Sequence, residues 1–238
     1  MDNKKHLLFC FPFAGGTADF YNNLEQECGD NIRLIKLEYS GHGSRMKEPL
    51  CRSFDDTTND LLPYMQSILD ENPDVSYSLM GYSMGSIALF DVLRRILNIE
   101  SIKAPQRVFI SAHQPQPIRS LRSVPDDGVD EWVKDRTIEF GGVDKKLLNN
   151  KIFWRIYLPI FRNDYKMIAD YDFDSIEFET NIPATIFFSE EDTPYEEMKE
   201  WGKFFVGESE FIEYTGSHFF IDTYCRDMAE VIKDRLLI

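Results

Sequence analysis

Short apolar runs alternate with longer amphipathic stretches along most of this 238-residue chain. Apolar runs of about five residues, rich in β-branched and aromatic side chains, are typical of buried strands. Between residues 55 and 69, Leu61, Met65 and Ile68 recur at helical spacing instead. The alternation predicts an α/β fold, with a mostly parallel central sheet and helices on both faces. The expected strands are Leu7–Phe11, Arg33–Leu37, Val75–Met80, Arg107–Ser111, Ala184–Phe188 and Glu210–Tyr214, and the expected helices are Asp19–Glu27, Asp55–Leu69, Ser86–Leu97, Pro194–Phe205 and Thr223–Leu237.

One segment, from Gln114 to about Asp174, interrupts this alternation because it contains no good strand candidate. Prolines and a glycine come first, and helical stretches follow near Val129–Phe140, Lys145–Phe161 and Asp164–Tyr171. An insertion after a strand of a parallel sheet lies beside the edge where ligands bind. We therefore expect a single domain spanning residues 1–238, with a helical lid insertion at about 115–174. The alternative is an extra packing layer without a role in binding.

The sequence GYSMG at Gly81–Gly85 has the form G-x-S-x-G. Five residues match this pattern easily by chance, but here a strand candidate runs into the motif and a helix candidate leaves it. A sharp strand-to-helix turn exposes the serine hydroxyl, and flanking glycines let the two backbones approach each other. The context favours the α/β-hydrolase fold with Ser83 as the nucleophile. The alternative is a tight turn that contains a serine by coincidence.

A serine hydroxyl is a poor nucleophile unless a base accepts its proton. Hydrolases of this fold carry the serine, the acid and the histidine in that order along the chain. His6 and His42 precede Ser83, and no plausible acid separates His113 from the serine. His218 lies in a loop between the last expected strand and the last expected helix. We therefore predict that His218 is the general base.

The acid that orients the histidine is expected just after the strand Ala184–Phe188. Three carboxylates follow this strand, at Glu190, Glu191 and Asp192. We predict Asp192, because a short side chain at the far end of the loop suits a fixed hydrogen bond to the imidazole, and Glu191 is the alternative. Such an acid holds the tautomer of the histidine and stabilises the imidazolium ion.

Acyl transfer also requires N–H donors for the oxyanion of the tetrahedral intermediate. Met84, directly after the nucleophile, is expected to supply one backbone N–H. Ala14, in the glycine-containing loop after the first strand, is expected to supply the other. The loop Gly41–Arg45 follows the second strand, and we interpret its His42 and Arg45 as structural.

The composition argues against several other functions. The chain has 41 acidic against 26 basic side chains, and a net charge of −15 opposes binding to nucleic acid or to an anionic membrane. Its four cysteines lack metal-ligand spacing, and no apolar stretch is long enough for a signal peptide or a membrane span. We expect a soluble, reduced, cytoplasmic protein without a metal ion.

Five segments, taken together and in order, resemble the stand-alone type II thioesterases that accompany nonribosomal peptide and polyketide synthetases. In that family a histidine usually stands where this chain has Phe13 and where it has Tyr82, and neither is a triad position. The acid of the family falls on Asp192, in a loop that lacks the usual glycines. The matching segments are FCFPFAGG at 9–16, GHGSR at 41–45, GYSMG at 81–85, FRNDY at 161–165 and GSHFF at 216–220.

The resemblance implies hydrolysis of acyl or aminoacyl thioesters on phosphopantetheine arms, for proofreading or product release. The substrate would carry the phosphopantetheine, so the enzyme itself would need no cofactor. The partners would be acyl or peptidyl carrier protein domains of a synthetase, and the resemblance favours a monomer. Because carrier proteins are often acidic, we expect a local basic docking patch and name Arg119 and Arg122 as candidates.

Three other functions stay open on the sequence alone. A carboxylesterase acting on small esters would use the same triad, and so would an acyltransferase that replaces water with an alcohol or an amine. A non-catalytic binding protein would keep the fold without using the serine. The pairing of Ser83 with His218 argues against the last of these.

Overall fold

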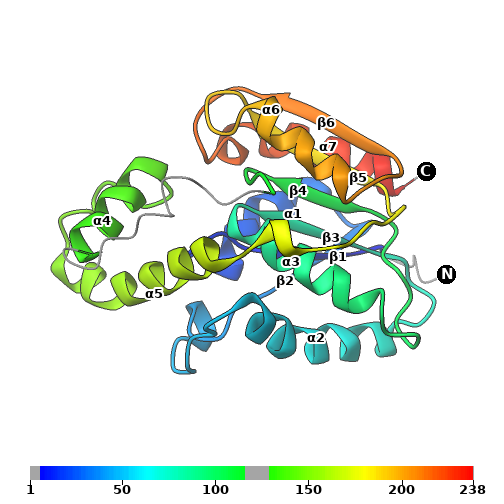
Figure 1. The fold of residues 1–238 in the computed structure, drawn as a ribbon, viewed down its shortest axis with the longest axis horizontal. Coiled ribbons are helices and arrows are strands. Elements are labelled where there is room, and N and C mark those ends of the chain that lie inside the picture. Colours follow the sequence, from blue (N-terminus) through cyan, green and yellow to red (C-terminus); the bar gives the residue numbers. More distant parts are fainter. Residues whose placement is uncertain (1–5, 116–128, 238) are drawn as a thin grey trace.

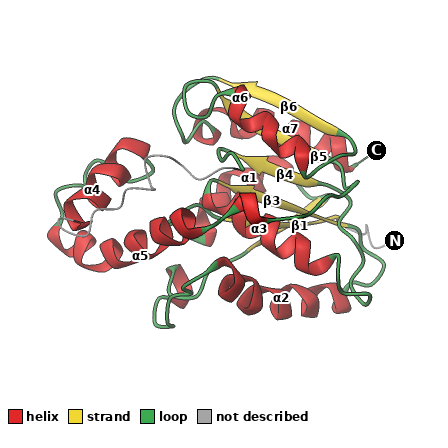
Figure 2. Ribbon diagram, in the orientation of Figure 1, coloured by secondary structure: helices red, strands yellow, loops and turns green. Residues whose placement is uncertain are grey.

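A computed structural model of the chain describes residues 6–115 and 129–237. Six strands form one sheet in the order β2-β1-β3-β4-β5-β6, and every neighbouring pair is parallel (Figure 2). The predicted parallel sheet is therefore confirmed. The strands are β1 (His6–Phe11), β2 (Ile32–Lys36), β3 (Tyr77–Tyr82), β4 (Val108–Ser111), β5 (Ala184–Ser189) and β6 (Ser209–Tyr214).

Helices cover both faces of the sheet because the central strands are apolar on both sides. Alternate residues of β1 enter different clusters: Leu7 and Phe9 pack with α2 (Phe54–Glu71) and α3 (Met84–Ile96), whereas Leu8 and Cys10 pack with the opposite face. That second face is covered by α1 (Asn22–Cys28) and α7 (Ile221–Leu236), which lie against each other. The layered arrangement brings the loops after β1, β3, β5 and β6 to one edge of the sheet. Short 3₁₀ helices at Ala18–Tyr21, Gly43–Arg45 and Phe173–Ser175 lie in the connections.

Between β4 and β5 lie α4 (Val129–Phe140) and α5 (Lys151–Asp170). Figure 1 shows them together at the end of the molecule opposite both termini. Residues from both helices line the cavity above Ser83, as a lid requires. The interpretation of the chain as one domain with a lid insertion stays a prediction, and Arg119 and Arg122 of the expected docking patch lie outside the described residues.

Four expected helices differ from the structure. The first of them, Asp19–Glu27, is a 3₁₀ helix at Ala18–Tyr21 followed by α1. The two helices expected at Lys145–Phe161 and Asp164–Tyr171 are one continuous helix, α5, which starts after Asn150. The Asn150 side chain accepts hydrogen bonds from the first N–H groups of α5 and so fixes this start. The helix expected at Pro194–Phe205 is instead a short α6 (Tyr195–Met198) followed by a 3₁₀ helix at Lys199–Lys203.

No helix within the two described ranges is long and apolar enough to cross a membrane.

Candidate active site

Ser83 stands at the sharp turn between β3 and α3. Its φ of 53° and ψ of −121° lie in a region that few residues other than glycine adopt. The Ser83 N–H donates to the Ser111 carbonyl at 2.8 Å, and this bond holds the turn against β4. A Cβ on Gly81 would overlap the Gly85 backbone, and a Cβ on Gly85 would overlap the Phe11 backbone. The two glycines of the motif are therefore required by the packing of β1, β3 and α3.

Ser83, His218 and Asp192 form a continuous chain of hydrogen bonds. The Nε2 atom of His218 lies 2.8 Å from the Oγ atom of Ser83. The Nδ1 atom of the same ring lies 3.0 Å from both carboxylate oxygens of Asp192. Both Ser83 and His218 are buried, so these interactions are shielded from water. This geometry allows His218 to accept the serine proton while Asp192 holds the ring.

The other three histidines have different partners. The ring of His6 contacts the Ser78 hydroxyl, and the ring of His113 contacts the Gln114 carbonyl. The ring of His42 contacts Asp164. None of these hydrogen bonds involves Ser83.

The loop after β5 gives its carboxylates separate roles. Asp192 faces His218, whereas Glu191 turns away and accepts the Gly216 N–H at 2.9 Å. Glu190 accepts the Tyr195 N–H at the start of α6. The position of Asp192 supports the prediction that it is the acid, rather than Glu191. Glu191 instead stabilises the loop that carries His218 by accepting the Gly216 N–H.

Tyr82 holds the histidine loop in place, a contact that the sequence did not reveal. Its side chain is fully buried on the α1/α7 face, and its hydroxyl donates to the His218 carbonyl at 2.7 Å. The same oxygen accepts the Ile221 N–H at 3.4 Å. Tyr82, the residue before the nucleophile, thus holds the backbone of His218, the predicted base, through a hydrogen bond from the α1/α7 face of the sheet.

We expect Tyr82→Phe to lower kcat about tenfold with little change in KM. The variant leaves the His218 carbonyl without its donor, and a lost buried hydrogen bond costs roughly 1–3 kcal/mol. Steady-state kinetics on a small thioester and urea unfolding would measure the two consequences. Tyr64→Phe, at an exposed tyrosine of α2, is the matched control. Wild-type kcat in a folded Tyr82→Phe enzyme would contradict this role.

The two backbone N–H groups predicted as oxyanion donors belong to residues near Ser83: Ala14 lines the same cavity, and Met84 follows Ser83 in the chain. Within the described residues, neither the Ala14 N–H nor the Met84 N–H makes a hydrogen bond. Ala14 lines the cavity at Ser83, and Met84 is the first residue of α3, where the helix dipole favours negative charge. Both are therefore free to receive an oxyanion.

The cavity at Ser83 is narrow and mostly aromatic. Its volume is only about 30 Å³. The centroid of the Phe140 ring, at the end of α4, lies 5.1 Å from the centroid of the His218 ring. The hydroxyls of Thr137 and Tyr165, 3.0 Å apart, are polar groups in its wall. The other lining residues are Phe13, Ala14, Gly141, Phe161, Ile168 and Phe219. A small chamber with mostly apolar walls strengthens electrostatic interactions with a reacting carbonyl.

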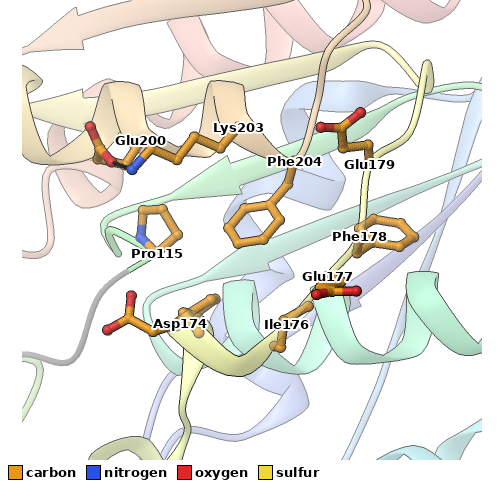
Figure 3. A pocket seen from close by; sticks show the side chains of 10 residues that line it. Pro115, Asp174, Ile176, Glu177, Phe178, Glu179, Glu200, Lys203 and Phe204 are labelled. Atoms are coloured by element: carbon orange, nitrogen blue, oxygen red, sulfur yellow. Dashed lines mark ion pairs between the residues drawn. The ribbon is translucent and has the colours of Figure 1, made fainter.

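A larger hollow of about 560 Å³ lies elsewhere, between the segment after α5 and the 3₁₀ helix Lys199–Lys203 (Figure 3). Phe204 lies among carboxylates there, and Lys203 pairs with Glu200. None of Ser83, Asp192 and His218 lines it. Despite its size, this hollow is not where Ser83, His218 and Asp192 lie.

Among the described residues, no group of three histidine, cysteine or acidic side chains is placed to hold a metal ion.

The fold and the site geometry define a hydrolase of the α/β type, and comparison with known proteins identifies the family. Residues 6–236 match the thioesterase domain model, so the chain belongs to the thioesterase domain family. The protein is therefore a thioesterase with the α/β-hydrolase fold.

Several of the proteins similar to this chain are thioesterases of biosynthetic pathways, and others are the medium-chain fatty acid synthase thioesterases of rat and human. A probable cadicidin biosynthesis thioesterase of Streptomyces griseus is 30% identical over 90% of this chain, which spans 58% of that protein's length. The crystal structure of ClbQ from the colibactin NRPS/PKS pathway has a TM-score of 0.83 at 26% identity, covering 98% of this chain and 97% of the other. YbtT, a type II thioesterase from the yersiniabactin pathway, has a TM-score of 0.81 at 23% identity, covering 99% and 94%. The resemblance to type II thioesterases is thus confirmed.

Proposed function

We propose that this thioesterase hydrolyses acyl or aminoacyl thioesters on the phosphopantetheine arms of carrier proteins in nonribosomal peptide or polyketide synthesis. The hydrogen-bonded chain from Asp192 through His218 to Ser83 is the observation that carries the proposal. The biosynthetic relatives support the choice of a carrier-bound substrate. We further propose that the enzyme acts as a monomer, removing unwanted acyl groups or releasing products.

In the first half of the reaction, the Ser83 hydroxyl attacks the thioester carbonyl as His218 Nε2 takes its proton. The carbonyl oxygen becomes an oxyanion and accepts hydrogen bonds from the Ala14 and Met84 N–H groups. The C–S bond then breaks, and the imidazolium of His218 protonates the leaving pantetheine thiolate. Asp192 stabilises that imidazolium throughout.

In the second half, water enters the space left by the thiol. His218 takes a proton from this water, and the resulting hydroxide attacks the ester carbonyl on Ser83. The same two N–H groups stabilise the second oxyanion. Collapse returns the proton to Ser83 and frees the acid.

The cavity must widen before a substrate enters. About 30 Å³ is space for only a few water molecules, too little for an acyl group with its pantetheine arm. Phe140, the last residue of α4, and Gly141, which follows it, are part of the cavity wall. We propose that a displacement of this part of the lid admits the substrate.

We expect the enzyme to favour a carrier-bound substrate over small esters. Rates of acetyl release from acetyl-phosphopantetheinyl carrier protein, from the acetyl thioester of N-acetylcysteamine and from p-nitrophenyl acetate should be compared as kcat/KM. Contacts with the carrier lower the barrier only in the first case, and a gain of about a hundredfold would require roughly 2.7 kcal/mol. Equal or better values for the ester would favour the small-ester hydrolase, and acyl products formed with added alcohols or amines would favour an acyltransferase.

A further inference from the structure

A buried acid and histidine lie behind the loop that carries Ala14. Asp164, on α5, and His42, in the loop after β2, are almost completely buried, and His42 Nε2 lies 2.9 Å from Asp164 Oδ2. The triad uses neither residue. The same Asp164 oxygen accepts the N–H of Gly15 at 2.7 Å. One carboxylate therefore joins the lid helix to two loops at the sheet edge.

The protonation of His42 follows from its two partners. Its Nδ1 atom faces the Ser40 carbonyl at 3.2 Å, and its Nε2 atom faces the Asp164 carboxylate. Both partners only accept hydrogen bonds, so the ring satisfies both as an imidazolium. Burial alone lowers the pKa of His42, but Asp164, Ser40 and Glu38 raise it, and the net direction is above the ordinary value of 6.5.

Phe161 adds a second contact between α5 and Gly15. It lies one helical turn before Asp164, and its ring lies so close to Gly15 that a Cβ there would overlap it. Gly15 also has a φ of +71°, a conformation that other side chains rarely adopt. The turn that follows Ala14 is thus held by two contacts to Gly15: the Phe161 ring packs against its α-carbon, and the Asp164 carboxylate accepts its N–H.

Building on the proposed reaction, we propose that Asp164 and His42 are positioning residues for the oxyanion hole. Asp164 holds the Gly15 N–H and so directs the adjacent Ala14 N–H toward the reacting carbonyl. His42 neutralises the Asp164 charge, which would otherwise repel the oxyanion. Because Asp164 belongs to α5, the oxyanion loop is organised only while the base of the lid helix is docked.

The first test replaces Asp164 and follows two readouts. Asp164→Ala should lower kcat on the N-acetylcysteamine thioester about a hundredfold, near the lower end for loss of an oxyanion donor, with little change in KM. Asp164→Asn still accepts the Gly15 N–H and should retain activity to within about tenfold. Asp170→Asn, at an exposed acid of the same helix that pairs with Lys166, is the matched control.

A trifluoromethyl ketone analogue of the thioester separates positioning from mere stability, because its Ser83 adduct places an oxyanion in the hole. Its Ki should rise by the same factor as kcat falls. A folded Asp164→Ala enzyme with kcat within about threefold of the control, or with an unchanged Ki, would overturn the proposal. If Ser83→Ala matched wild type on the same thioester, the proposed function itself would fail instead.

A pH profile tests the role of the pair even if Asp164→Ala does not fold. As pH rises through the raised pKa of His42, the imidazolium loses its proton and no longer balances the charge of Asp164, so kcat should fall. The contribution of the pair to the free energy of unfolding is lost over the same pH range. Glu38 and Tyr39 also face His42, but burial raises the pKa of Tyr39 well above 10, so it stays neutral. In Asp164→Asn this alkaline decline should disappear. An unchanged decline in Asp164→Asn would overturn the proposal.

Discussion

Ser83→Ala should lose about a million-fold in kcat on a small thioester, because alanine has no hydroxyl with which to form the acyl-enzyme. The substitution removes one oxygen from a buried turn and retains both oxyanion donors. Residual hydrolysis should therefore exceed the uncatalysed rate by roughly 10³–10⁴-fold. Stopped assays with high enzyme concentration would measure the loss.

A fluorophosphonate probe provides the control for this variant. Wild type should be labelled once, at Ser83, and the alanine variant should not react. Labelling of wild type at another residue, or retention of more than about one hundredth of kcat in Ser83→Ala, would contradict the assignment. Circular dichroism should be the same for both proteins.

Asp192→Asn is expected to cost about 10⁴ in kcat, because an amide favours the wrong tautomer of His218 and does not stabilise the imidazolium. The shape of the site is retained, since both oxygens of Asp192 now face Nδ1 at 3.0 Å. KM should change little. The measurement is steady-state kinetics on the same thioester as for Ser83→Ala.

Glu191→Gln is the matched control for this carboxylate. Glu191 accepts the Gly216 N–H, and a glutamine side chain can accept it too. Its effect should therefore stay below about tenfold. The reverse order, with Glu191→Gln more damaging than Asp192→Asn, would assign the acid to Glu191.

The strands and the strand-to-helix turn at Ser83 were predictable because their sequence signals are local. Apolar runs such as Ala184–Phe188 are too short for helices, and all six expected strands overlap the observed ones. The strand before Ser83 extends further than expected, through Gly81 and Tyr82. Glycine lowers the strand signal of the sequence, but here close packing against α3 requires it.

The first lid helix, α4, has the expected bounds, but α5 was harder to predict because its continuity depends on long-range contacts. Arg162 and Asn163 lie between the two helices that the sequence analysis expected, but inside the observed α5. In the structure Asn163 donates to the Cys51 carbonyl and accepts from Arg52, so the helix continues with its polar residues paired. Tertiary hydrogen bonds thus override the local preference.

The supporting residues of the site were missed for a related reason. Serine, base and acid follow from chain order, but Tyr82 acts on His218 from 136 residues away, and Asp164 acts on Gly15 from 149 residues away. No spacing rule links such pairs. The unusual tyrosine beside Ser83 and the FRNDY segment marked the positions without revealing their partners.

Mass spectrometry of the enzyme mixed with acetyl-phosphopantetheinyl carrier protein tests the central claim most directly. Wild type should remove acetyl from the carrier and transiently gain the mass of one acetyl group at Ser83, while Ser83→Ala leaves the carrier loaded. A carrier that stays acetylated with wild type, under conditions where small esters are cleaved, would contradict a carrier-protein thioesterase.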